Sequence, residues 1–307
     1  MKTILKALLK DYTTFQLGGP CRFLVKCQTP AELANAIQFL IKDKIPYILI
    51  GGGSNLVVSD QGIDSAVIRY VSDNALIERV GDDLIVAAST ILDDLALFCV
   101  DQGLQGLNFT TGIPGTVGGA VVGNAGAWGH QVGDVFKSAQ IIGADGNILE
   151  VQKDYFSFSY RHSKLKETGE IVSSVRFSLK PSDSLALACE RAEILKKRAE
   201  KHPNLHTHPC AGSFFRNIEP TSKAERRQAA GWFLQEAGAK DFHVGGAYIF
   251  DKHANIIVKG PQCSAQDVHD LHLKMIDAVK DRFNLQLIRE VRFVGGFKSQ
   301  NEREGFW

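Results

Sequence analysis

The chain has 307 residues, a length that suits two or three subdomains better than a single compact core. Its 44% hydrophobic and 22% charged residues are typical of a globular protein that folds in water, and no apolar run approaches the length needed to cross a bilayer. Lysine and arginine (35) nearly balance aspartate and glutamate (34), which excludes an overall basic surface for nucleic acid. Six cysteines without a C-x-x-C pair indicate reduced thiols, so we expect a cytoplasmic protein.

The first 70 residues are predicted to mix helix and strand. The opening MKTILKALLK is expected to form a short amphipathic helix, because Lys6 and Lys10 interrupt its apolar residues and no signal-peptide cleavage site follows. A longer helix is predicted to run from residue 30 to about Lys42, because Thr29 can cap it and Glu32 can reach back to the cap. The strands predicted here cover residues 45–50 and 65–70.

From residue 71 onward, helices and strands are predicted in an irregular order. The predicted helices cover residues 90–102, 187–201 and 223–237, with a last one beginning at Ser264. The predicted strands cover residues 82–89, 138–144, 146–151, 170–179, 245–250, 255–260 and 285–296. The tail that ends at Trp307 is polar and is expected to be frayed. Because strands and helices do not alternate regularly, the fold class is predicted to be α+β.

Two glycine-rich tracts can bring the backbone close to a ligand. GGGSN, Gly51 to Asn55, follows a strand but lacks the G-x-G-x-x-G spacing and precedes another strand, which disfavours a Rossmann site. Consecutive glycines can still aim several N–H groups at one anion, although a plain tight turn is at least as common. The tract from Thr111 to Gly129 is compatible with a flat ligand that carries phosphates and, equally, with tight backbone packing.

Several polar residues could carry chemistry, but local sequence alone assigns none of them. Arg161 follows an aromatic run and is either a solvated cation or a preorganised clamp for a carboxylate or phosphate. Ser213 lies in A-G-S-F-F rather than G-x-S-x-G, which disfavours a hydrolase. Glu290 is interpreted as a solvent-facing strand carboxylate paired with Arg289 or Arg292. The last candidate is a cluster of possible metal ligands, His202, His206, His208 and Cys210. Two prolines interrupt it and its spacing fits the usual zinc patterns only loosely, so no metal site is predicted.

Eight segments, taken in chain order, resemble the MurB family of flavoenzymes, the UDP-N-acetylenolpyruvoylglucosamine reductases. The segments are YTTFQLGG, ILIGGGSNLVVSD, GIPGTVGGAVVGNAGAWG, FSYRHS, AGSFFRN, GWFLQEAGAKDFHVGGA, HANIIV and REVRFVG. Any one of them could arise by chance, but eight in the right order over nearly the whole chain could not. The resemblance is to the shorter form of the enzyme.

This resemblance implies a two-part FAD-binding fold of the vanillyl-alcohol oxidase type plus a third, α+β substrate-binding domain. The implied domains are residues 1–70 with 285–307, residues 71–200, and residues 201–284. FAD is expected to bind non-covalently, with NADPH as reductant, in a monomeric cytoplasmic enzyme. The expected cofactor contacts are Gly51, Gly52, Gly53, Ser54, Asn55, Gly112, Ile113, Pro114, Gly115, Gly118, Gly119, Asn124, Ala125, Gly126 and Ala127.

The implied reaction is the NADPH-dependent reduction, through FAD, of UDP-N-acetylglucosamine enolpyruvate to UDP-N-acetylmuramate, a step of peptidoglycan precursor synthesis and thus of cell-wall growth and division. By motif match, Arg161 and Glu290 would polarise the substrate carboxylate, and Ser213 would protonate C2. Glu290 can act beside an anion only if it holds or shares a proton. The expected substrate-binding residues are Tyr160, Arg216 and Asn217.

Two other functions are considered. One is an oxidase of small alcohols or hydroxy acids on the same flavin fold, in which His130 or Cys99 would have to attach the flavin covalently. The other is a catalytically silent flavin-binding scaffold. Both are disfavoured, because Ser213 and Glu290 keep their family contexts and the catalytic trio is intact. Cys210, Arg216 and Lys259 depart from the usual family residues, and Arg216 keeps a cation for the substrate's diphosphate.

Overall fold

The computed structural model describes residues 2–220 and 226–298. Its first sheet has the strand order β1-β2-β5-β3, with β1 antiparallel to β2 and the other pairs parallel. The strands are β1 (Lys2–Leu5), β2 (Cys21–Cys27), β5 (Ile63–Tyr70) and β3 (Tyr47–Ile50). Helix α1 (Pro30–Lys42) packs against β2 and β5 through Leu33, Ile37 and Leu40, which are fully buried. Its predicted start is confirmed, because Thr29 and Glu32 form a capping box.

A second sheet of antiparallel strands has the order β12-β11-β13-β7-β6. Its strands are β12 (Ile148–Gln152), β11 (Phe136–Ile142), β13 (Ile171–Ser178), β7 (Asp83–Ala87) and β6 (Ile77–Val80). The helices in this part of the chain are α2 (Leu92–Asp101), α3 (Val117–Val122), α4 (Val132–Val135), α5 (Leu165–Thr168) and α6 (Ser184–Lys201). Because α1 also packs on β13, the first and second sheets share one hydrophobic core.

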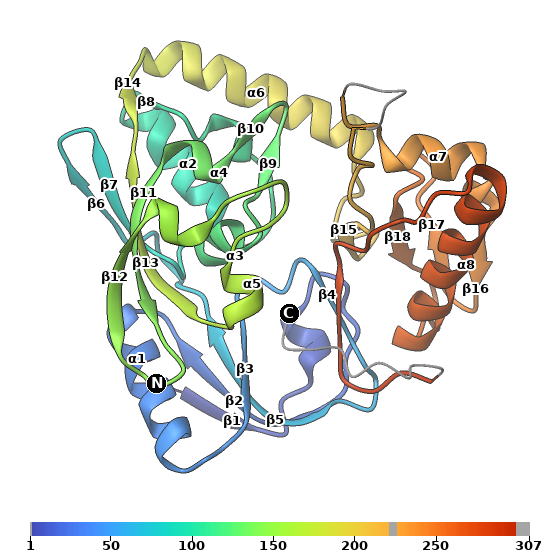
Figure 1. Cartoon of the computed structure of the whole chain (residues 1–307), viewed down its shortest axis with the longest axis horizontal. Helices are drawn as coiled ribbons and strands as arrows, with labels where there is room; N and C mark the ends of the chain where they lie inside the picture. Colours follow the sequence, from blue (N-terminus) through green and yellow to red (C-terminus); the bar gives the residue numbers. More distant parts are fainter. Residues whose placement is uncertain (1, 221–225, 299–307) are drawn as a thin grey trace.

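The third sheet stands apart from the other two and carries α7 and α8 (Figure 1). Its antiparallel order is β15-β18-β17-β16, and these strands are β15 (Cys210–Ser213), β18 (Ile256–Lys259), β17 (Ala247–Ile249) and β16 (His243–Val244). Helices α7 (Ala230–Glu236) and α8 (Ala265–Phe283) pack against each other and help to form a separate core. The capping box of Ser264 and Asp267 confirms the predicted start of α8.

After the third sheet, the chain returns to the N-terminal part of the molecule. There β19 (Arg292–Val294) pairs in parallel with β4 (Leu56–Val58). Short strand pairs join β8 (Leu104–Gln105) to β14 (Lys180–Pro181) and β9 (Gly126–Ala127) to β10 (His130–Gln131). Single 3-10 turns occupy Leu9–Tyr12, Asn108–Thr110, Lys153–Phe156 and Ala239–Asp241.

Three sequence predictions of secondary structure need correction. The opening segment forms β1 rather than a helix, because β2 offers it a complete antiparallel partner and tertiary pairing outweighs weak helical periodicity. The helix predicted over 223–237 is helical only from Ala230, since Gln228 bridges to Ile218, while its residues 223–225 lie outside the described part. The last strand covers only Arg292–Val294 of 285–296. The tail after Lys298 also lies outside the described residues.

Candidate active site

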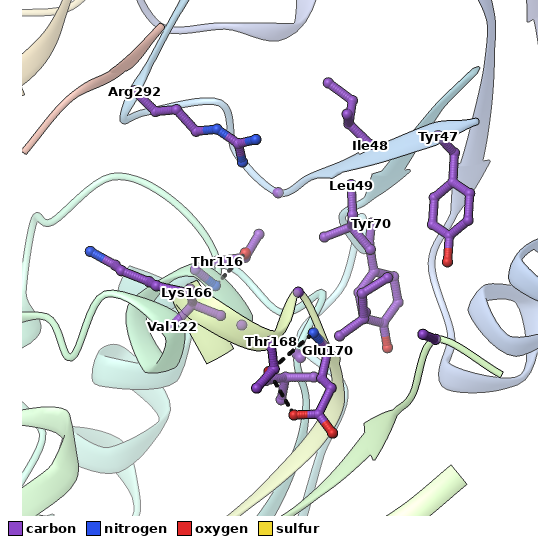
Figure 2. Close-up of a pocket in the computed structure, with 18 of the residues that line it drawn as sticks. Tyr47, Ile48, Leu49, Tyr70, Thr116, Val122, Lys166, Thr168, Glu170 and Arg292 are labelled. Atoms are coloured by element: carbon purple, nitrogen blue, oxygen red, sulfur yellow. Dashed lines mark hydrogen bonds between the residues drawn. The ribbon is translucent and has the colours of Figure 1, made fainter. Parts of the chain in front are cut away.

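A cavity of about 620 Å³ lies where β3 and β5 approach α3, α5 and β13. Figure 2 shows its labelled side chains, among them Leu49 on β3, Tyr70 on β5, Thr116 at the start of α3 and Lys166 on α5. Gly51 of the first glycine tract lines it too, as do Gly118 and Gly119 of the second. The size and the mixture of apolar walls with a few polar groups are typical of a cofactor site.

The two glycine tracts touch each other beside this cavity. The Ser54 hydroxyl donates to the carbonyl oxygen of Pro114 at 2.9 Å, and a Cβ on Gly52 would lie 2.8 Å from the Cα of Gly115. Gly53 has a left-handed φ of +66°, and a Cβ there would lie 2.1 Å from the carbonyl oxygen of Tyr12. Tight backbone packing therefore explains these glycines, and it forms one edge of the cavity.

The first tract also leaves hydrogen-bond donors available to an anion. The backbone N–H groups of Gly52, Gly53 and Ser54 donate to no other residue in the described part of the chain. Successive amides around a left-handed glycine form a concave anion site. This fits the pyrophosphate of a flavin dinucleotide, so the residues present are compatible with FAD.

Most backbone donors of the second tract are already used by the protein. Among the residues predicted to contact the cofactor, the amides that donate to protein oxygens are those of Gly112, Ile113, Gly118, Gly119, Asn124 and Ala125. A Cβ on Gly119, by contrast, would lie 3.7 Å from the Thr116 hydroxyl, which is an ordinary van der Waals distance. The small residues of this tract therefore leave room for a ligand at the cavity wall. Direct contacts of its individual residues with the cofactor stay a prediction.

The Asn124 side chain is committed to the fold. It is 1% exposed, its φ is +42°, and its Nδ2 donates to Gln131 Oε1 at 2.9 Å and to the Ser159 carbonyl at 2.8 Å. Its Oδ1 accepts from the Gly133 amide at 2.9 Å. These bonds tie the second tract to the loop that carries Tyr160 and Arg161.

Arg161 and Glu290, far apart in the sequence, form an ion pair. The Arg161 Nε lies 3.1 Å from the Glu290 Oε1, and the two side chains are 25% and 21% exposed. The buried Nε nevertheless has no aligned hydrogen-bond acceptor, so the contact is electrostatic rather than a well-formed hydrogen bond. The interpretation of Glu290 as a solvent-facing strand carboxylate is thus wrong, because the chain turns it inward before β19 begins.

The backbone of Glu290 joins three parts of the site. Its amide donates to the carbonyl oxygen of Phe214 at 2.8 Å, directly after Ser213 at the end of β15. Its own carbonyl accepts from Asn55 Nδ2 at 3.1 Å. Tertiary structure therefore brings the first glycine tract, Glu290 and the Ser213 segment together. Within residues 2–220 and 226–298, the half-buried Ser213 at the end of β15 makes no side-chain hydrogen bond to the protein.

Charge in this cluster favours an anionic ligand. Burial raises the pKa of Glu290 above its usual range, against the opposing effect of Arg161, Lys166 and Arg216. Burial also lowers the pKa of Lys166 to about 8, helped by the neighbouring Arg216. Three cationic side chains around one carboxyl group leave excess positive charge, which the carboxylate of a substrate can compensate.

The predicted substrate-binding residues lie near this cluster. The Asn217 amide donates to the Tyr160 hydroxyl at 3.3 Å, and the Arg227 guanidinium lies 4.1 Å from the centre of the Tyr160 ring. The Asn217 side chain accepts from the Ala230 amide at 3.2 Å and so helps to begin α7. Arg216 has a buried Nε without a partner in the described part of the chain, which suits a role toward an anion.

The structure also shows the surroundings of cysteines and histidines that the sequence offered as candidates for flavin attachment or metal binding. Cys99 and Cys210 are buried, and burial raises the pKa of Cys99 to about 12 and that of Cys210 above its usual range. The His202 ring packs on His253, and partial desolvation of the ring lowers the pKa of His202 to about 4, with a smaller effect of Arg198, although the residue keeps an exposed surface. Within residues 2–220 and 226–298, no group of three or more potential ligands could hold a metal ion.

Sequence reasoning missed Lys166 and Arg198. Lys166 follows the FSYRHS segment by three positions, and nothing in a lone lysine indicates that it reaches the cavity. The Arg198 guanidinium lies 4.9 Å from the centre of the Trp128 ring, and its Cδ would be 3.0 Å from a Cβ on Gly112. Both depend on contacts between distant segments.

Comparison with known proteins agrees with this geometry. The profile of an FAD binding domain matches residues 21–152, and that of the C-terminal domain of UDP-N-acetylenolpyruvoylglucosamine reductase matches residues 202–294. The reductase of Clostridium novyi is 33% identical over 288 residues, which cover 94% of this chain and 91% of that protein. The chain belongs to the UDP-N-acetylenolpyruvoylglucosamine reductase (MurB) family.

Further MurB relatives support the assignment. The reductase of Agathobacter rectalis is 35% identical over 301 residues, covering 94% of this chain and 93% of that protein. The crystal structure of the MurB enzyme from Thermus caldophilus superposes with a TM-score of 0.77 at 32% identity, covering 96% and 98% of the two chains. The predicted family and α+β FAD-binding fold are confirmed. In the described part of this MurB chain, no helix is both long and apolar enough to span a membrane.

Proposed function

We propose that the chain reduces UDP-N-acetylglucosamine enolpyruvate to UDP-N-acetylmuramate, using FAD and NADPH. The observation that carries the proposal is the ion pair of Arg161 and Glu290. The backbone of Glu290 also bonds to Asn55 of the first glycine tract and to Phe214, the residue after Ser213. This arrangement can hold a carboxylate next to a flavin site, with a hydroxyl nearby.

The first glycine tract would hold the FAD pyrophosphate through the free amides of Gly52, Gly53 and Ser54. When bound, FAD supplies the hydride that NADPH delivers to it. The protein's own task is to orient an enolpyruvyl carboxylate and to stabilise the charge that develops on it. Arg161 is suited to that task, because its guanidinium is partly buried and its Nε is not saturated by hydrogen bonds.

Glu290 would share a proton with the substrate carboxylate. Burial raises its pKa, so the protonated form persists to higher pH than for an exposed glutamate. A protonated Glu290 can donate a hydrogen bond to the carboxylate instead of repelling it. Ser213 would then deliver the proton to C2, because its hydroxyl makes no hydrogen bond to the described part of the protein. Its place at the end of β15 brings it close to Glu290, whose amide donates to the carbonyl of the next residue, Phe214.

Arg216 would bind the substrate's diphosphate, with Tyr160 and Asn217 shaping the pocket around it. The buried, unpartnered Nε of Arg216 supports this role. We further propose the three-domain division given above, with residues 201–284 forming the substrate domain. The enzyme is proposed to be a monomer in the cytoplasm, where its product would enter cell-wall synthesis and support cell shape and division.

The experiment that tests this function follows the two half-reactions separately by stopped-flow absorbance. The purified protein is expected to be yellow, to be bleached by NADPH, and to be reoxidised by the enolpyruvyl substrate under anaerobic conditions. Ser213→Ala is expected to keep bleaching but to lose reoxidation by roughly 100-fold or more, as expected when a group needed only in the transition state is removed. Ser182→Ala, an exposed serine outside the site, is the matched control.

The outcomes separate the functions considered. A colourless protein without affinity for FAD overturns the enzyme assignment. A yellow protein that the enolpyruvyl substrate cannot reoxidise is a different flavoprotein. Normal reoxidation in Ser213→Ala shows that another group donates the proton.

A further inference from the structure

Lys166 is a polar side chain near the catalytic pair to which the sequence assigned no role. Its Nζ donates to the carbonyl oxygen of Arg161 at 2.8 Å, and its side chain also lines the cavity, where Figure 2 shows it near Thr116. The same lysine therefore contacts the backbone of the catalytic arginine and the edge of the flavin cavity.

The hydrogen bond falls where the backbone is strained. Arg161 has a φ of +56°, a left-handed conformation that costs a non-glycine residue free energy and persists only where its surroundings hold it. The turn is anchored on one side by Ser163, whose hydroxyl donates to the Val122 carbonyl of α3 at 2.8 Å. On the other side it is held by Lys166, whose amide also donates to the Ser163 carbonyl at 3.0 Å.

The charge of Lys166 acts on the same group as that of Arg161. Lys166, Arg161 and Arg216 all favour the ionised form of Glu290, which burial disfavours. The charged groups around Lys166 are Arg216 and Arg161, which disfavour its ammonium form, and Glu290, which favours it. Proton loss from Lys166 therefore makes Glu290 hold its own proton more tightly, because the two sites are coupled.

We propose that Lys166 is a positioning residue of the reductase site, which holds the Arg161 turn in its left-handed conformation and balances the charge of Glu290. The proposal rests on the function proposed above. It requires Lys166 to matter more for the step that uses Arg161 and Glu290 than for reduction of the flavin.

The test compares Lys166→Met, which removes the donor and the charge, with Lys166→Arg, which keeps both. Lys166→Met is expected to slow reoxidation by the enolpyruvyl substrate by roughly 10-fold to 100-fold, as misplacement of a catalytic group does, with a smaller effect on bleaching by NADPH. Lys166→Arg is expected to restore most of the rate. Lys164→Met is the matched control, since that lysine belongs to the same turn but lies over the Tyr155 ring, 4.1 Å from its centre.

A second readout does not depend on turnover. The carboxyl carbon of Glu290, labelled with carbon-13 and assigned by its absence in Glu290→Gln, is titrated by NMR in each variant. Its pKa is expected to rise in Lys166→Met and to stay unchanged in Lys166→Arg and Lys164→Met. If Lys166→Met does not retain flavin, Lys166→Gln, which keeps a donor but no charge, is measured by the same two methods and is expected to show the same rise.

The results distinguish this proposal from the function on which it rests. If the wild-type protein is not reoxidised by the enolpyruvyl substrate, the proposed function fails. If the wild-type is reoxidised, the role of Lys166 is refuted by two results in Lys166→Met taken together. The Glu290 titration is unchanged, and the two half-reactions are either equally slowed or not slowed at all.

Discussion

Replacing Asn124 by alanine tests whether this residue serves the fold or contacts the cofactor directly. The substitution removes an amide side chain that is 1% exposed and makes three hydrogen bonds, to Gln131, Ser159 and Gly133. It also places alanine at a φ of +42°, which asparagine tolerates far better. Both effects act on the protein without any ligand.

The expected loss of stability follows from these contacts. Ser159 is exposed, so water can replace Asn124 at its carbonyl, whereas Gly133 is buried and its amide would be left unpaired. An unpaired buried donor costs about 1–3 kcal/mol, and the left-handed backbone costs alanine about 1–2 kcal/mol more. We therefore expect Asn124→Ala to lower the free energy of unfolding of the flavin-free protein by about 2–5 kcal/mol.

Guanidinium unfolding of the flavin-free protein, followed by circular dichroism, measures this loss. Asn124→Gly, which tolerates the backbone conformation, should recover about 1 kcal/mol of it. Asn147→Ala, which removes an exposed hydrogen bond to Asp145, should change stability by less than about 0.5 kcal/mol. If flavin-free Asn124→Ala unfolds like the wild-type and only FAD affinity falls, the structural account is refuted and Asn124 is a direct cofactor ligand.

Two further predictions concern buried ionisable groups. Because folding raises the pKa of Glu290 from its usual 4.5, its contribution to stability is complete below pH 4.5 and is lost as the pH rises through the folded value. Glu290→Gln cannot ionise, so between pH 4 and pH 8 the thermal midpoint of the wild-type should fall relative to that of the variant. A difference that stays constant with pH contradicts the raised pKa. Of the six cysteines, only Cys189 is exposed, so a thiol reagent should label one thiol in the native protein and six after denaturation. Rapid labelling of a second native thiol would show that a buried cysteine is accessible.

Local sequence determined those features whose cause lies within a few residues. The starts of α1 and α8 follow from Thr29 with Glu32 and from Ser264 with Asp267, because each capping box satisfies the free amides of its own first turn. Ordered motifs along the whole chain also identified the family and its FAD-binding fold, which the comparisons confirm. The opening segment was predicted wrongly, because its strand exists only through its pairing with β2.

Motif match named Arg161, Ser213 and Glu290, but only the tertiary structure shows how their segments contact one another. Nothing near Glu290 in the sequence indicates that it meets Arg161 or that Asn55 holds its carbonyl, and its raised pKa depends on burial and on cations from other segments. The candidate role of Lys166 rests on the hydrogen bond from its ammonium group to the Arg161 carbonyl, which the sequence does not show. Electrostatic effects act over distances in space, so residues remote in the chain set the charge of the site, and only the folded chain brings them together.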